Sequence, residues 1–225
     1  MTNIRIFFSK KGRAKYISHL DMYRLFMRCF KKTTIPIWYT EGFNPHMYMT
    51  FPMPLSLGTE SDKECVDIKL TEEMPISELK LQLTGIFPEG IEVTDVAEPK
   101  KDQKEIAFAD YEIEIYLQDG DAQKALERFN ELCSREEILA QKKGKSHGRK
   151  VIKEVDIKPM FKLLDARAEE IDGEMALRLK LRCECSISKS LNPSLVVGAC
   201  FSDEEIRLIR INRRAILTDK LEEFA

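Results

Sequence analysis

What this 225-residue sequence lacks excludes several classes of protein. It has no G-x-x-x-x-G-K-S/T loop, no G-x-G-x-x-G, no H-E-x-x-H and no G-x-S-x-G, so the common nucleotide-binding, zinc-protease and hydrolase signatures are missing. No apolar run approaches the ~20 residues of a membrane helix, and the N-terminus lacks a signal-peptide pattern. We therefore expect a cytoplasmic protein with no membrane partner.

Metal ligands are scarce. The chain has three histidines, and none of its six cysteines forms a C-x-x-C pair. The two closest cysteines, Cys183 and Cys185, lie in the alternating stretch 176–187 and share its apolar face. Free cysteine behaves as a small hydrophobe, so a structural role is expected, with a metal or redox role as the alternative. We expect no metal and no cofactor.

Charge is balanced over the whole chain. There are 36 basic and 38 acidic residues, which gives a net charge of −2, and 43% of the residues are hydrophobic. This is the composition of a globular protein. Total charge therefore does not indicate nucleic acid, and any basic surface must be local.

Hydrophobic periodicity predicts an element order close to β-α-β-β-α-β in each half of the chain. In the first half, strands are expected at 4–8, 37–40, 64–70 and 90–96, and helices at 18–33 and 76–87. In the second half, strands are expected at 111–117, 138–143, 151–157, 176–187 and 205–211, helices at 121–133 and 192–201, and an insertion around 158–173.

This order predicts an α+β protein of two tandem ferredoxin-like halves with antiparallel sheets. We expect an N-terminal domain over 1–100 and a C-terminal domain over 108–225, joined by a charged linker without periodicity. The first domain would carry the motifs SHLD and GFNPH, and the second a basic loop at 141–153.

The SHLD motif opens the first predicted helix. Ser18 is expected to be its N-cap, and Asp21 completes a capping-box pattern. His19 would then occupy the first helical position, where its imidazole can meet an anion beside free backbone N–H groups. Tyr16 precedes the motif and is a further candidate for proton transfer. The alternative is that these residues only cap the helix.

The GFNPH motif has turn chemistry throughout, because glycine permits positive φ, asparagine favours turns and proline fixes φ. Its candidate site residues are Glu41, Gly42, Phe43, Asn44, Pro45 and His46. A rigid turn is one interpretation, and a rigid support for an amide and an imidazole is the other. Strand order places His46 away from His19, whereas the proline-rich segment 41–63 could fold back, so both placements stay open.

Two basic elements predict phosphate contacts, with a solvated surface as the alternative for each. Arg24, Arg28 and Lys31 recur at i, i+4 and i+7 on the first helix. The segment 141–153 is expected to be a mobile hairpin loop with these candidates: Lys142, Lys143, Lys145, His147, Arg149 and Lys150. Base stacking on the first sheet is not expected, because Phe7 is the one aromatic candidate on the strands 4–8 and 64–70.

Residues 16–70, with 148–159 and 191–201, resemble the uncharacterised domain found beside, or fused to, radical S-adenosylmethionine (radical SAM) proteins. SHLD and GFNPH carry the resemblance, while Met47 departs from it, since proline would be expected after the histidine. The resemblance implies a bacterial, cytoplasmic accessory protein whose partner is a radical SAM protein in a separate chain. It also implies a link to RNA maturation, but no activity of the chain's own.

These observations favour an RNA-binding module that presents tRNA or rRNA to a partner enzyme. One alternative is a metal-independent endoribonuclease with His46 or His19 as general acid or base, similar in architecture to the nucleases that process CRISPR repeats. The other alternative is a protein–protein adaptor that docks through 46–57. The sequence does not indicate the oligomeric state.

Overall fold

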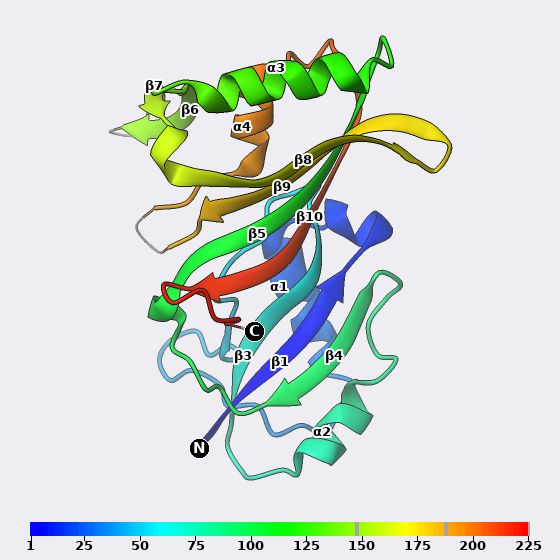
Figure 1. Ribbon diagram of the computed structural model, residues 1–225. Helices are drawn as coiled ribbons and strands as arrows, with labels where there is room; N and C mark the ends of the chain where they lie inside the picture. Colours follow the sequence, from blue (N-terminus) through cyan, green and yellow to red (C-terminus); the bar gives the residue numbers. More distant parts are fainter. Residues whose placement is uncertain (147–148, 187–188, 225) are drawn as a thin grey trace. The chain divides into compact units, whose positions relative to one another are not determined.

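The computed structural model describes residues 1–146, 149–186 and 189–224, so His147 and Ile187 lie outside the described residues (Figure 1). It is a mixed α+β structure with a large, mostly antiparallel sheet and, among the described residues, four α-helices. Contacts divide the chain into unit 1, Met1–Ile106 with Arg213–Ala225, and unit 2, Ala107–Asn212. The tandem ferredoxin-like halves and the domain limits 1–100 and 108–225 stay predictions.

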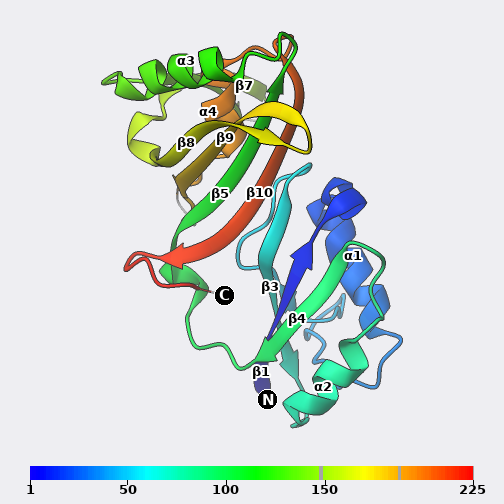
Figure 2. The ribbon, with the colours of Figure 1, turned by 45° about the vertical axis from the view of Figure 1, so that its right-hand side comes forward.

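Unit 1 is a sheet with two helices (Figures 1 and 2). Its strand order is β4-β1-β3, with β2 and the end of β10 also beside β3, and β1 pairs antiparallel with both β3 and β4. The elements are β1 (Thr2–Lys10), α1 (His19–Phe30), β2 (Met49–Thr50), β3 (Glu60–Leu70), α2 (Ile76–Leu83) and β4 (Ile91–Ala97). A short 3-10 turn, η1 (Gly12–Tyr16), links β1 to α1.

Helix α1 forms where the sequence predicts it, because a cap and an apolar stripe coincide. The backbone N–H of Asp21 donates to the Ser18 side chain at 3.2 Å, which satisfies one of the free donors of the first turn. Met22 and Phe26 then face the sheet and join one core cluster with Leu79 of α2 and residues of β1, β3 and β4. Phe26 is fully buried, and its ring lies 4.9 Å from that of Phe8.

The second strand of unit 1 is much shorter than expected. The predicted strand at 37–40 is reduced to isolated bridges, Ile37 with Leu70 and Tyr39 with Met47. Strand β2 has two residues and pairs with β3. Proline has no N–H to donate to a ladder, and the segment from 36 to 54 contains four prolines, so long pairing cannot form here.

Unit 2 has the strand order β10-β5-β9-β8, and β6 pairs with β7 in a separate two-stranded sheet. In Figure 1, α3 and α4 lie on the same side of β8 and β9. The elements are β5 (Ile106–Leu117), α3 (Ala122–Ser134), β6 (Leu139–Ser146), β7 (Arg149–Asp156), β8 (Phe161–Ile171), β9 (Glu174–Glu184), α4 (Pro193–Cys200) and β10 (Ile206–Thr218). Two short 3-10 turns, η2 (Gln103–Glu105) and η3 (Lys158–Met160), precede β5 and β8.

The insertion was predicted in the wrong place. Residues 158–173 contain β8, which pairs with β9 in the main sheet, whereas the predicted strands at 138–143 and 151–157 form the separate hairpin. A register shift between Leu163 and Asp165 changes the phase of side chains along β8. The strand therefore shows no clean alternation in the sequence. Its partner β9 does alternate, and Leu177, Leu179 and Leu181 are fully buried as expected.

No helix among the described residues is both long and apolar enough to cross a membrane.

We expect Phe26→Ala to destabilise the protein by about 3–5 kcal/mol, because it removes a fully buried ring and leaves a cavity between α1 and the sheet. Urea denaturation measures this change. Phe43→Ala is the matched control, since the Phe43 side chain is fully exposed and should change stability by no more than about 0.5 kcal/mol. Equal effects of the two substitutions would contradict the packing described for Phe26.

Candidate nucleic-acid interface

The GFNPH motif is the tip of a hairpin closed by Thr40 and His46. The Thr40 N–H donates to the His46 carbonyl at 2.9 Å, and the His46 N–H donates to the Thr40 hydroxyl at 3.2 Å. His46 Nδ1 lies 3.0 Å from the Thr40 hydroxyl and 3.1 Å from the Asn44 carbonyl oxygen. A carbonyl only accepts, so the contact with Asn44 fits the tautomer with hydrogen on Nδ1 and leaves Nε2 as an acceptor.

The tip of this hairpin is exposed from Glu41 to His46. Gly42 has φ of 121°, which side chains rarely tolerate, so glycine is required for the turn. Phe43 follows and is fully exposed. The turn interpretation of GFNPH therefore describes the backbone, while the role of its side chains stays a prediction.

His19 lies at the first position of α1, with its ring against Phe51. The two ring centroids are 5.4 Å apart in an edge-to-face arrangement. Tyr16, at the end of η1, is exposed and lies beside Lys15, whose Nζ is 5.6 Å from its ring centroid. Among the described residues, no hydrogen bond or ring contact joins His19, His46 and Tyr16 to one another. The three candidates therefore make no direct contact with one another in the described structure, and their catalytic role stays a prediction.

The basic face of α1 is exposed at Arg24, Arg28 and Lys31. Arg24 makes an ion pair with Asp21 at 3.2 Å. Arg28 and Lys31 make no ion pair with any residue that the structure describes, so both cations are open to an external anion. The ion pair distinguishes Arg24 from the other two residues, and the predicted contact of all three with phosphate stays a prediction.

The basic segment 141–153 is a hairpin of two strands over its described part, where a loop was predicted. Residues of β6 and β7 pair in register, with Lys142 opposite Lys153, Lys145 opposite Lys150, and Ser146 opposite Arg149. Lys143 stands opposite Ile152. This register brings basic positions from both strands together. The predicted contact with phosphate stays a prediction.

Trp38, Tyr48 and Lys69 form a cluster that the sequence reasoning missed, here called the sheet-face cluster. The Trp38 and Tyr48 rings are 5.7 Å apart, and Lys69 Nζ lies 5.2 Å and 5.1 Å from their centroids. Backbone hydrogen bonds hold it, from Trp38 N–H to the Lys69 carbonyl at 2.7 Å and from Tyr48 N–H to the Trp38 carbonyl at 3.0 Å. Lys69 makes no ion pair with a described residue.

The sheet-face cluster lies on the face of β3 that points away from α1 and α2. Ile68 and Leu70 belong to the core under the helices, so Lys69 between them points to the other side. Trp38 and Tyr48 are likewise out of phase with the buried Ile37 and Met47. This alternation of buried and exposed residues is the sequence signal that could have indicated the cluster. The cluster was missed because aromatic residues were considered on the strands 4–8 and 64–70 alone.

A hollow of about 200 Å³ adjoins Tyr48 on this face. Arg5 lines it, and its Nε and one terminal nitrogen donate to the Asp67 carboxylate at 2.7 Å and 2.9 Å. The Phe224 ring covers the guanidinium at 4.2 Å. The second terminal nitrogen of Arg5 is buried without a hydrogen-bond acceptor among the described residues. Buried donors are normally satisfied, so this nitrogen has an unused capacity to donate.

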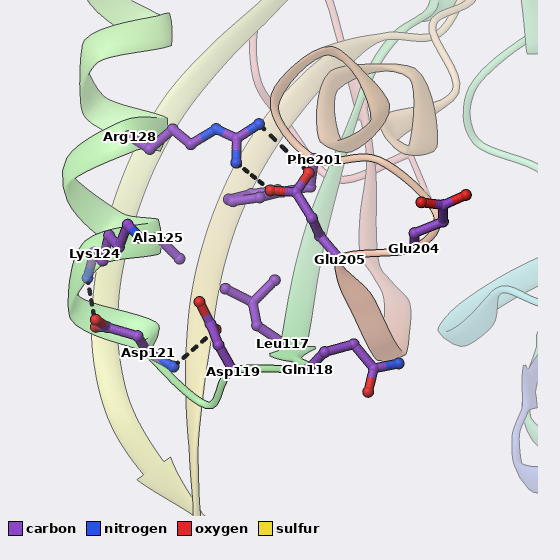
Figure 3. Close-up of a pocket in the computed structure, with 10 residues that line it drawn as sticks. All are labelled: Leu117, Gln118, Asp119, Asp121, Lys124, Ala125, Arg128, Phe201, Glu204 and Glu205. Carbon is purple, nitrogen blue, oxygen red and sulfur yellow. Dashed lines mark hydrogen bonds and ion pairs between the residues drawn. The ribbon is translucent and has the colours of Figure 1, made fainter.

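Unit 2 has a larger hollow, of about 240 Å³, beside the start of α3 (Figure 3). Leu117, Ala125 and Phe201 supply apolar surface. Arg128 makes an ion pair with Glu205, and its guanidinium carbon lies 5.2 Å from the Phe201 ring centroid. The hydrogen bond from Arg128, with a further one from the Ser202 N–H, lowers the pKa of Glu205 to about 2. The negative charge of Glu205 is therefore already compensated by Arg128 within the protein.

The cysteines have the properties of core residues. All except the half-buried Cys133 are buried. Burial raises the pKa of the Cys65 thiol to about 12 and that of Cys200 to about 11, and it raises that of Cys183 as well. In the described part of the chain, no group of three or more histidine, cysteine or acidic side chains could hold a metal ion.

Residues 3–193 match the family DUF2344, whose description is "Uncharacterized protein conserved in bacteria". The match covers well over half of the chain. The chain belongs to the DUF2344 family. The family description names no radical SAM partner and no RNA ligand, so both stay predictions. No curated protein matches the sequence.

Titration of Glu205 tests the ion pair in unit 2. We expect NMR to follow a midpoint at about 2, because Arg128 stabilises the ionised form. The stabilisation from this pair is present above the unfolded-state pKa of ~4.3 and is lost as the pH falls through about 2. Arg128→Leu should return the midpoint toward ~4.3, whereas Lys124→Leu, in the same hollow, should leave it unchanged. A midpoint of ~4.3 for Glu205 in the unmodified protein would contradict the ion pair between Arg128 and Glu205.

A thiol reagent such as DTNB should react slowly with the native protein at pH 7, because the raised pKa values leave little thiolate and most of the sulfur atoms are buried. All six thiols should react once guanidinium has unfolded the chain. A thiol that reacts rapidly in the folded protein would show that one cysteine is accessible and activated, against a purely structural role.

Proposed function

We propose that the chain is a bacterial, cytoplasmic RNA-binding module whose base-contacting surface is the sheet-face cluster. The observation that carries this proposal is the pair of rings, Trp38 and Tyr48, with the Lys69 ammonium within 5.2 Å of each centroid. Unpaired RNA bases stack on aromatic side chains, and nearby cations neutralise the phosphates that connect them. The cluster supplies both groups on one face of a sheet.

The hollow beside Tyr48 supports the same proposal. A base that stacks on Tyr48 would extend into the hollow that Arg5 and Asp67 line. Every RNA base carries carbonyl or ring-nitrogen acceptors, so a guanidinium in the wall of this hollow suits a base edge. The Asp67 carboxylate already orients the guanidinium through two hydrogen bonds, which reduces the entropy lost when a ligand binds.

Further phosphate contacts, beyond that of Lys69, are assigned to basic residues outside the cluster. Arg28 and Lys31 on α1 make no ion pair with a described residue, and the register of β6 and β7 groups basic positions in unit 2. Such contacts add affinity without sequence preference and weaken as salt rises. Base contacts and phosphate contacts are thus proposed for different residues, which makes them separable by substitution.

The proposed function includes two further predictions, the tandem ferredoxin-like fold and a radical SAM protein as partner. The strand orders β4-β1-β3-β2 in unit 1 and β10-β5-β9-β8 in unit 2, each with two helices, support tandem ferredoxin-like halves. The partner, a radical SAM protein in a separate chain, is proposed from the sequence resemblance alone. In this scheme the module holds RNA while its partner performs the chemistry.

The chain offers a direct test, because Trp38 is its single tryptophan. Titration with single-stranded RNA should quench the tryptophan fluorescence to saturation, since a base that stacks on the indole quenches it. Tyr48→Ala should weaken binding by about 5–150-fold, which corresponds to about 1–3 kcal/mol for one stacked base. Lys69→Gln should reduce the slope of log K against log salt by about 1.

Tyr39→Ala is the matched control, because Tyr39 is an exposed aromatic residue of the same hairpin on the opposite side of its backbone. It should leave affinity unchanged. Binding that shifts RNA in a gel without quenching would place the RNA away from Trp38 and contradict the proposal. Chelator-resistant cleavage that is lost in His46→Ala or His19→Ala would favour the nuclease, and the absence of any RNA binding would favour the adaptor.

A further inference from the structure

A group of charged side chains is buried in unit 1 on the helix-covered face of the sheet. Lys10 is 2% exposed, Glu64 4% and Arg213 1%. Arg213 Nε donates to a Glu64 oxygen at 2.9 Å, and a terminal nitrogen donates both to the other Glu64 oxygen and to the Met53 carbonyl. The charge of Glu64 is thus matched by Arg213. The Lys10 ammonium remains as a surplus positive charge.

Lys10 has fewer acceptors than a buried ammonium needs. An ammonium carries three donors, and Lys10 Nζ donates to the Ile17 carbonyl at 2.8 Å but makes no ion pair with a described residue. Burial lowers the pKa of Lys10, and Glu64 opposes that change without a direct contact. Burying an uncompensated charge is costly, so a counter-ion that reaches Nζ would remove a large penalty.

Lys10 lines a pocket at the start of α1. His19 and Phe51 belong to its lining, together with Lys10 and Glu64. The other lining residues are apolar: Phe8, Met22, Met53, Pro54 and Leu55. His19 makes a ring contact with Phe51, but its ring nitrogens make no hydrogen bond with any described residue. The pocket therefore presents an ammonium and an imidazole between apolar walls.

We infer that this pocket, over Lys10 and His19, binds the carboxylate of a small organic monocarboxylic acid. The space in this pocket is about 20 Å³, which is about the room for one water molecule, so a single oxygen atom of a ligand can reach Lys10 while the rest of the ligand stays at the mouth. A planar carboxylate is smaller than a tetrahedral phosphate. Glu64 also lines the pocket and repels a dianion more strongly than a monoanion.

In the inferred complex, one carboxylate oxygen accepts from Lys10 Nζ and the other from the His19 ring. The apolar part of the acid lies at the mouth against Phe51. This site is distinct from the sheet-face cluster, because Phe8 and Glu64 belong to the face of the sheet under α1 whereas Lys69 points to the other face. The inference does not depend on the proposed function, and each can fail without the other.

Thermal unfolding with three probes tests the site. Benzoate should raise the midpoint temperature in a saturable way, because it binds the folded state. Benzamide, which has the same ring without the charge, and inorganic phosphate at equal ionic strength should not raise it. Lys10→Met should abolish the effect of benzoate while keeping the fold, because it replaces an uncompensated buried charge by an apolar chain of similar length. Lys11→Met, next in sequence and half-exposed, is the matched control and should keep the effect.

Histidine NMR gives a second and independent measurement, because the chain has three histidines. Benzoate should shift the ring resonances of His19 and leave those of His46 in place. The inference is overturned if benzoate has no effect, if its effect survives in Lys10→Met, if phosphate acts equally well, or if the His19 resonances do not move.

Discussion

The pairing of β1 with β3 determines which side chains of unit 1 can act together. Its register sets Arg5 opposite Asp67, Asn3 opposite Lys69 and Phe8 opposite Glu64. Side chains alternate between the two faces, so a slip of one residue would exchange the apolar core with the polar face. The core under α1, the Arg5–Asp67 pair and both inferred binding sites therefore depend on the same set of backbone hydrogen bonds.

The surroundings of Glu64 and of Lys69, on opposite faces of this sheet, differ in what covers them. Helices α1 and α2 exclude water from one face, so a charge there must be compensated, as Arg213 compensates Glu64. On the other face, Trp38 and Tyr48 stay partly exposed, and Lys69 lies beside them without an ion-pair partner among the described residues. Base stacking suits the second environment, and binding of a small anion suits the first.

The motifs that stand out in the sequence have mainly local roles in the structure. Ser18 caps α1, and the Thr40–His46 hydrogen bonds close the turn that carries Phe43. Local motifs can be recognised in sequence because the residues that satisfy the backbone are neighbours. Lys10 and Trp38 belong to no such local motif, because their neighbours in the structure come from distant segments.

The sequence by itself determined the helices, the alternating strands, the caps and the turn, because hydrophobic period and backbone hydrogen bonding act within a few residues. It misplaced the insertion, because the bulge in β8 destroys the alternation by which a strand is recognised. The tertiary structure alone brought Glu64 to Arg213, 149 residues apart in sequence, and Lys69 to Trp38 and Tyr48. Contacts between residues so far apart in sequence depend on strand pairing and register. The packing of the whole unit sets these, and no local pattern does.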